Sequence, residues 1–257
     1  MHLIVEVPLY FMYFRVMLLE ICANSYQSAI AAQKAGAQRI ELCSELALGG
    51  ITPSSGLIEK VVADLEIPVY VLIRPRSGDF TYYDDEFDVM LRDITFCRNK
   101  KVAGIVSGVL HPDLTIDEER TQTLVDASGG MAFTFHRAFD WTPNAMESLK
   151  ILQRIGVDRI LTSGQSETAL SGLFVLKMLL EKSNNKPVIL PGGGIRPSNI
   201  GQFIAAGFKE IHASASNTIE SLEGAFPMHN LQAVQQDLQT YSDPEKIKKL
   251  LEAMYNS

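Results

Sequence analysis

The motif AGAQRI at 35–40 returns in the same form as IGVDRI at 155–160 and as AGFKEI at 206–211. In each copy a glycine stands where a helical pattern stops, and an apolar run follows it. Glycine is the usual residue at the left-handed end of a helix, so each copy predicts a helix-to-strand turn. A turn repeated in this way indicates successive βα units and a parallel sheet.

Eight short runs rich in Val, Ile and Leu alternate with helical patterns from Met17 onward. They lie at 18–22, 39–43, 68–73, 104–110, 131–136, 159–162, 187–190 and 210–213. Their spacing of about 27 residues suits a strand, a helix and two loops. We therefore predict an α/β fold of one domain, a (β/α)8 TIM barrel. A doubly wound open sheet ranks second, because no GxGxxG turn follows the first run.

Helix signals lie between these runs. Ser25 is placed to cap a helix that stops at Gly36, and apolar residues at helical spacing predict further helices over 84–100 and 168–182. The Asp243-Pro244 pair predicts the start of the last helix, after a long loop at the top of the barrel.

Composition narrows the class of protein. The chain has 257 residues, 46% of them apolar and 21% charged, which is ordinary for a soluble globular domain. A net charge of −7 without a basic stripe argues against a nucleic-acid partner. Three cysteines without a CxxC pair indicate reduced intracellular thiols.

The first sixteen residues form an apolar extension to a domain at 17–257. Glu6, Pro8 and Arg15 interrupt it, so we expect no transmembrane helix and no membrane partner. A signal peptide also fits poorly, because the segment lacks a basic start.

Polar residues gather where the predicted strands end. Side chains alternate between the lumen and the helix layer of a barrel, and function lies at the C-terminal strand ends. Alternation directs five ionisable groups to one lumen: Glu20, Glu41, Arg74, His136 and His212. Arg76, Arg137 and Asp140 lie in the loops that follow.

These groups have two interpretations. Buried charges are unfavourable unless they pair or meet a ligand. In the first interpretation Glu20 or Glu41 abstracts a proton, His136 donates one, and Arg74 with Arg76 or Arg137 holds negative charge. In the second, Glu20 and Glu41 form a structural ion-pair network with Arg74 and one histidine.

A glycine run follows the seventh predicted strand. Gly192, Gly193 and Gly194, with Ser214 after the eighth strand, occupy the two loops that commonly hold phosphate in this fold. A tight turn is the alternative function of the glycines, and no lysine strengthens the phosphate interpretation.

Two cysteines offer a different chemistry. Cys22 and Cys43 end adjacent predicted strands, and soft thiolates select Cu(I) or Zn. Buried cysteine more often only packs, as we expect of Cys97 on the helix at 84–100.

Seven motifs together resemble the CutC family, the copper homeostasis proteins. They are LEICANS (19–25), RIELCSELALGGITPS (39–54), VLIRPRSGDFTY (71–82), FTFHRAFD (133–140), ILTSG (160–164), PGGGI (191–195) and EIHASA (210–215). The resemblance implies a TIM barrel, a cytoplasmic location, self-association, and a Cu(I) role with Cys22 and Cys43 as ligands. An enzyme acting by Glu, His and Arg chemistry on a small polar substrate, including a phosphorylated one, is the alternative function.

The chain departs from the family pattern after the fourth strand. Ser107 stands where the family has an aromatic residue, and the sequence His111-Pro112-Asp113-Leu114 lacks the glycine of the family's Asp-Gly turn. These changes affect the expected pocket wall.

Overall fold

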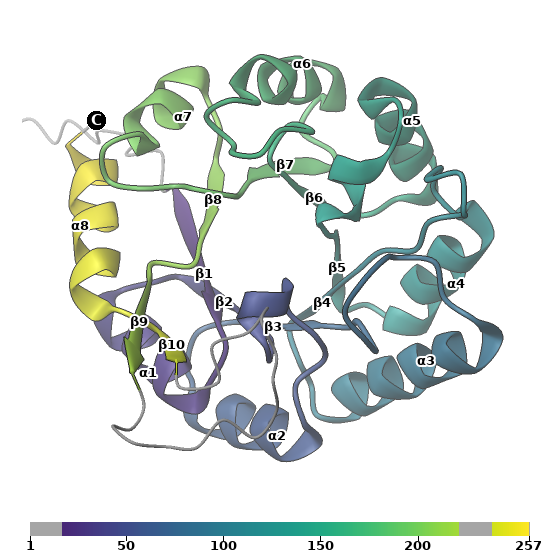
Figure 1. Cartoon of the computed structure of the whole chain (residues 1–257), viewed down its shortest axis with the longest axis horizontal. Coiled ribbons are helices and arrows are strands. Elements are labelled where there is room, and N and C mark those ends of the chain that lie inside the picture. The colour runs from purple at the N-terminus through teal and green to yellow at the C-terminus, as the bar shows by residue number, and fades with distance from the viewer. Residues whose placement is uncertain (1–16, 221–237, 257) are drawn as a thin grey trace, which may run out of the picture.

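Eight parallel strands form a ring that is surrounded by helices (Figure 1). This computed structural model describes residues 17–220 and 238–256, so the predicted apolar extension at 1–16 lies outside the described residues. The strands of the ring are β1 Leu18–Ala23, β2 Arg39–Leu42, β3 Val69–Leu72, β4 Gly104–Ser107, β5 Ala132–Phe135, β6 Arg159–Thr162, β7 Val188–Pro191 and β8 Glu210–Ala213. Their order is β7-β6-β5-β4-β3-β2-β1-β8, and β7 lies beside β8. The predicted TIM barrel is confirmed.

The helices lie outside the ring. They are α1 Tyr26–Ala35, α2 Ser55–Asp64, α3 Asp84–Asn99, α4 Glu118–Ser128, α5 Ala145–Ile155, α6 Leu173–Ser183, α7 Ile200–Ala206 and α8 Pro244–Tyr255. Ser25 caps α1 by accepting a hydrogen bond from the Ser28 amide. Gly36, Gly156 and Gly207 end α1, α5 and α7 with positive φ, as the three repeated turns predict.

The register of the parallel strands places alternate side chains in the lumen. Cys22 of β1 is aligned with Glu41 of β2, and Glu20 of β1 is aligned with His212 of β8. An inner cluster of Cys22, Cys43, Tyr70, Leu72 and Val106 fills part of the lumen. The intervening residues pack against the helices in a separate and larger core, which includes Leu19, Ile21, Ile40 and Leu42. The predicted inward faces therefore do point inward.

Two local features differ from the sequence prediction. β4 ends at Ser107, and Leu110 forms only an isolated bridge with Ile116. The regular helix α6 begins at Leu173, because the backbone of Gly172 packs directly against Ser163 and Gly164. A Cβ on Gly172 would lie 1.9 Å from the Ser163 carbonyl oxygen, so the chain crosses the end of β6 there.

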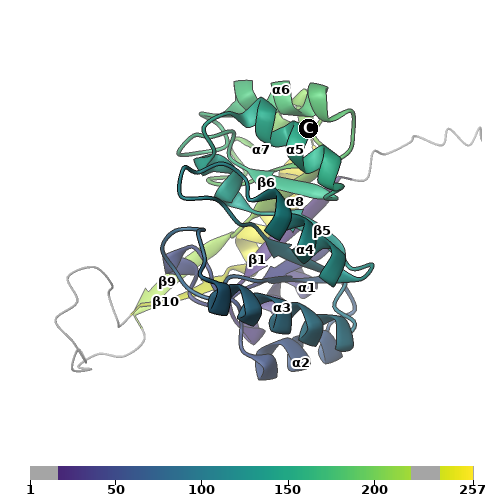
Figure 2. The ribbon, with the colours of Figure 1, turned by 90° about the vertical axis from the view of Figure 1, so that its right-hand side faces the viewer.

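A hairpin replaces part of the loop that we expected before the last helix. β9 Ser216–Glu220 pairs with β10 Leu238–Ser242 in antiparallel register. It projects from the side of the barrel where β8 ends (Figure 2). Ser242 ties its base to the barrel by donating hydrogen bonds to Ser28 Oγ and to the Cys22 carbonyl. Among the described helices, none combines the length and the apolar character that crossing a bilayer requires.

Candidate functional site

A cavity of about 1080 Å3 opens at the C-terminal ends of the strands. Most of the predicted site residues line it: Cys22, Glu41, Arg74, His136, Arg137, Asp140, Gly193, Gly194, His212 and Ser214. Four predicted residues lie outside its lining: Glu20, Cys43, Arg76 and Gly192. The structure therefore gathers residues from six strands and their loops around one cavity.

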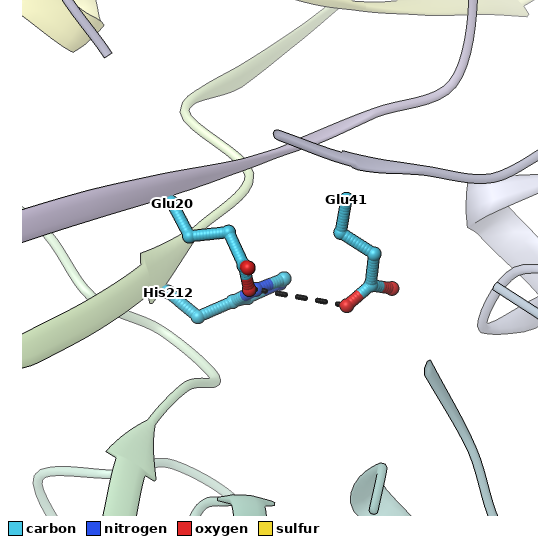
Figure 3. Close-up of side chains that lie close together, drawn as sticks. All are labelled: Glu20, Glu41 and His212. Carbon is cyan, nitrogen blue, oxygen red and sulfur yellow. Dashed lines mark hydrogen bonds and ion pairs between the residues drawn. The ribbon is translucent and has the colours of Figure 1, made fainter. Parts of the chain in front are cut away.

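Glu20, Glu41 and His212 meet at the floor of the cavity (Figure 3). His212 Nδ1 lies 2.8 Å from Glu20 Oε1 and 3.8 Å from Glu41 Oε2. Glu20 is 1% exposed and lies below the lining. Glu41 Oε2 is buried and accepts no hydrogen bond among the described residues.

An ion-pair network continues below this floor. Arg39 is 2% exposed and pairs with Glu20 and with Glu210, to which its Nη2 donates over 2.6 Å. Arg159 reaches the same Glu210 oxygen over 2.8 Å. The alternative network predicted from sequence had Arg74 as its cation; the cation that Glu20 meets is Arg39, because the strand register aligns these two residues directly.

The two glutamates have opposite electrostatic environments. Burial alone would raise the pKa of Glu20, but Arg39 and the hydrogen bond from His212 outweigh it and lower the pKa to about 2. Burial raises the pKa of Glu41 to about 7, with His212 opposing that rise. Burial disfavours a charged His212, yet the contacts with Glu20 and Glu41 raise its pKa. Two neighbouring carboxyl groups with clearly different pKa values are typical of sites for acid–base catalysis.

His136 is a neutral hydrogen-bond donor in the cavity wall. Its Nδ1 accepts from the Ala138 amide at 3.2 Å, so the ring proton of the neutral form is on Nε2. Burial, followed by the nearby charge of Arg74, lowers the pKa of His136 to about 3. Nε2 is buried and has no partner among the described residues.

Arg74 joins two loops at the edge of the cavity. It donates to the carbonyls of Leu48 and Gly50 after β2 and of Gly78 after β3. Its guanidinium lies 4.9 Å from the ring centroid of Phe80, and the centroid of the His136 ring lies 4.8 Å from that of Phe80. These contacts fix a buried positive charge beside His136.

Arg137 and Asp140 form a pair at the other edge, on the 3-10 helix η2 Arg137–Trp141. Arg137 Nε donates to Asp140 over 2.8 Å, and Nη2 donates to Ser163 Oγ over 2.9 Å. Asp140 also accepts from Thr162 Oγ1 and from the amides of Ser163 and Gln165. The carboxylate is thereby fully engaged, and it orients Arg137.

The glycine loop contributes two members to the lining. Gly193 and Gly194 have φ of +104° and +72°, which favour glycine. Gly192 serves a close approach instead: a Cβ there would lie 2.6 Å from Leu161 and 3.3 Å from His212. Arg76 points elsewhere and pairs with Glu86 over 2.5 Å.

The two predicted thiols lie side by side. Cys22 Sγ and Cys43 Sγ are 3.6 Å apart, and both residues are buried. The contact with Cys43, together with burial, raises the pKa of Cys22. Cys97 is buried against the helix-side core, as predicted.

Several lining residues were not predicted from the sequence: Phe80, Trp141, Arg196 and Lys246. Phe80 and Trp141 meet edge to face with centroids 4.9 Å apart. Trp141 is the single tryptophan of the chain and stays 47% exposed beside a predicted strand end, a signal that could have found it. The local sequence gives no signal that Lys246, on α8, lines the cavity.

Glu20, Glu41 and His212 also form a candidate cation site, with one donor atom from each within 4.8 Å of the others. Oxygen and nitrogen donors suit a hard or borderline metal rather than Cu(I). Both oxygens of Glu20 are already engaged, by Arg39 and by His212. A metal here would have to displace His212 from Glu20, so these residues fit an ion-pair cluster better than a metal centre.

Comparison with known proteins identifies the family. The profile of the CutC family matches residues 17–217. The chain belongs to the CutC family. A CutC relative from Photorhabdus laumondii is 48% identical over 203 residues, covering 79% of this chain and 82% of that protein. A CutC relative from Erwinia tasmaniensis is 44% identical over 203 residues, covering 79% and 80%.

A solved CutC structure has the same fold. It comes from Streptococcus agalactiae, and its name proposes a role in copper homeostasis. It is 34% identical, with a TM-score of 0.73, over 77% of this chain and 98% of that chain. Among more distant matches, 2,3-dimethylmalate lyase is 13% identical with a TM-score of 0.57, which shows only the shared barrel.

The departures from the CutC pattern are accommodated locally. Ser107 is fully buried and donates to the Ile73 carbonyl over 2.9 Å. Leu114 adopts a positive φ of +67° at the turn where a glycine is expected. That turn closes through the bond from the Leu114 amide to the His111 carbonyl, outside the cavity lining.

Proposed function

We propose that this CutC protein is an enzyme that transfers a proton on a small polar substrate bound in the barrel-top cavity. One observation carries the proposal. Within residues 17–220 and 238–256, Glu41 Oε2 is an acceptor without a donor and His136 Nε2–H is a donor without an acceptor. Both atoms are buried, and both residues line the same cavity. Each unpartnered buried group destabilises the fold by about 1–3 kcal/mol, so a ligand that satisfies both explains them.

The chemistry follows from these two atoms. Glu41 takes a proton from a carbon next to a carbonyl group, breaking the C–H bond and forming an O–H bond on the carboxylate. The electron pair moves to the carbonyl oxygen, which accepts a hydrogen bond from His136 Nε2–H. The fixed charge of Arg74 beside His136 stabilises that developing oxyanion. Glu20 acts through His212 and is a positioning residue.

Exchange of deuterium from the solvent into a C–H bond of the substrate tests the proposal. The product of the reaction need not be known for this test. The full-length protein is incubated in D2O with a panel of small carbonyl and hydroxy-acid compounds, with and without phosphate, and deuterium incorporation is followed by NMR. We expect one compound class to exchange, and Glu41→Gln to slow that exchange at least about 100-fold. Glu66→Gln, at an exposed glutamate outside the cavity lining, is the matched control.

Two outcomes would overturn the proposal. The first is the absence of catalysed exchange across the panel. The second is exchange that proceeds equally fast in Glu41→Gln and in Glu66→Gln. Retention of the unfolding midpoint in both variants shows that the comparison is between folded proteins.

The thiol pair supports a second function, Cu(I) binding. The family implies it, and the sulfur atoms of Cys22 and Cys43 lie 3.6 Å apart with Cys22 on the cavity lining. Two thiolates are soft donors of the kind that Cu(I) selects. The copper ion is in this case the cargo of the protein.

A Cu(I) titration against a competing chelator tests the second function. Under reducing conditions, tight binding is expected to be lost in Cys22→Ser and in Cys43→Ser and kept in Cys97→Ser. Weak Cu(I) binding that is the same in all three variants would refute the copper function. The cytoplasmic location and the homo-oligomeric state stay predictions, the latter measurable by sedimentation of the full chain.

A further inference from the structure

The cavity is electropositive in an acidic protein. Its lining has four cationic side chains, Arg74, Arg137, Arg196 and Lys246, against the two carboxylates of Glu41 and Asp140. The whole chain has a net charge of −7. A concave, positively charged site in a negative protein concentrates anions selectively.

Backbone donors add to this charge at the glycine loop. Gly193 and Gly194 line the cavity, and their consecutive amides donate no hydrogen bond within the part of the chain that the structure describes. Their positive φ values place them in a tight turn, and turns can arrange successive N–H groups around an anion. Ser214, which also lines the cavity, adds a hydroxyl that contacts only Ser216 Oγ, at 3.2 Å, among the described residues.

Arg137 lies against this loop, and two of its three guanidinium nitrogens are already engaged. Asp140 engages its Nε and Ser163 engages its Nη2, whereas Nη1 has no partner among the described residues. Nη1 lies 3.4 Å from the position that a Cβ on Gly193 would occupy. The guanidinium is therefore oriented before any ligand arrives, which reduces the entropy lost on binding.

We propose that the loop of Gly193 and Gly194, together with Arg137 and Ser214, binds the phosphate group of a small phosphomonoester. Phosphate suits this arrangement because peptide N–H groups, a guanidinium and a hydroxyl approach from different sides, and because charge-assisted hydrogen bonds to phosphate are strong. Arg196, exposed at the rim, adds a further cation.

The inference rests on the proposed function and names its substrate class. The phosphate binds at the rim, and the remainder of the molecule extends toward Glu41 and His136 on the same cavity lining. A cavity of about 1080 Å3 holds a phosphomonoester of several carbons.

Binding of inorganic phosphate to the full-length protein tests the inference by calorimetry at low ionic strength. We expect the Kd to rise at least about tenfold in Arg137→Gln and severalfold in Arg196→Gln. Arg92→Gln, at an exposed arginine on the outer face of α3, should bind as the unchanged protein does. Sulfate should compete, and chloride at equal ionic strength should not.

Phosphate that fails to bind, or that binds equally to all three variants, would overturn the inference. Arg196 is exposed, so its variant keeps the test valid if Arg137→Gln unfolds. The deuterium panel separates this inference from the proposed function. Exchange that needs Glu41 but ignores phosphate refutes only the phosphate site, whereas phosphate binding through Arg137 with exchange indifferent to Glu41 refutes only the catalytic proposal.

Discussion

Replacing Arg39 by methionine should be among the most damaging single changes in the barrel. Arg39 is 2% exposed and pairs with both Glu20 and Glu210, and its guanidinium lies 4.7 Å from the Tyr70 ring centroid. Burial would raise the pKa of Glu20, but Arg39 and His212 lower it from 4.5 to about 2. That lowering corresponds to about 3 kcal/mol of folding stability at pH 7.

Arg39→Met leaves both carboxylates buried without this cation. We expect a loss of about 3–5 kcal/mol at pH 7, measured by urea unfolding. Arg154→Met is the matched control, because Arg154 pairs with Glu118 on the exposed surface and should contribute less than about 1 kcal/mol.

The pH dependence gives the sign of the effect. In the unchanged protein the contribution of Glu20 is present above the unfolded pKa of 4.5 and is lost as the pH falls toward 2. In Arg39→Met the buried Glu20 favours its protonated form, so the stability difference between the two proteins should narrow as the pH falls from 7 to 4. A loss below about 1 kcal/mol at pH 7, or a difference that widens in acid, would refute this account of the network.

Three further predictions concern other parts of the barrel. Burial, aided by Arg74, lowers the pKa of His136 from 6.5 to about 3, so the unfolding free energy should fall as the pH drops from 6.5 to 3, by up to about 5 kcal/mol. His136→Asn should flatten that acid limb in denaturant titrations, and an unchanged limb would assign it to other groups. Gly104→Ala places a Cβ 2.7 Å from the Tyr70 ring and should lower the unfolding free energy by about 1–3 kcal/mol. Gly56→Ala, in open space on α2, should not lower it. Equal shifts of the thermal unfolding midpoint in the two variants would contradict the packing argument. Asp140→Asn removes a charged acceptor shared by Arg137, Thr162 and Ser163 and should cost about 2 kcal/mol and weaken phosphate binding, which calorimetry on the folded variant would check.

Strand alternation carried much of the site prediction. Glu41, His136 and His212 could be assigned to the lumen because a strand turns every second side chain to the same face, and the barrel closes those faces on one another. The same reasoning brought Cys22 and Cys43 together on adjacent strands. The soft thiolates of these two residues already suggested Cu(I) or Zn. The resemblance to the CutC family then favoured copper.

The cations were harder to assign. Arg74 was expected to pair with the glutamates in one interpretation, but its contact with the carbonyls of Leu48 and Gly50 depends on how a loop 24 to 26 residues earlier folds back. Arg39 was not among the predicted site residues, and its pairing with Glu20 follows from the register between β1 and β2. Register is a property of two strands together, so neither strand alone contains it.

The sequence by itself determined the eight βα units, the helix ends at Gly36, Gly156 and Gly207, and the inward face of each strand, because these follow from local periodicity and backbone preference. Only the tertiary structure decided which donors and acceptors are already paired. Glu20 is neutralised from below while Glu41 and His136 keep one unpartnered atom each among the described residues, and that difference depends on side chains contributed by distant strands and loops. Whether a buried donor or acceptor has a partner depends on the three-dimensional arrangement of the side chains. The chemistry of the cavity could therefore be inferred only from the folded barrel.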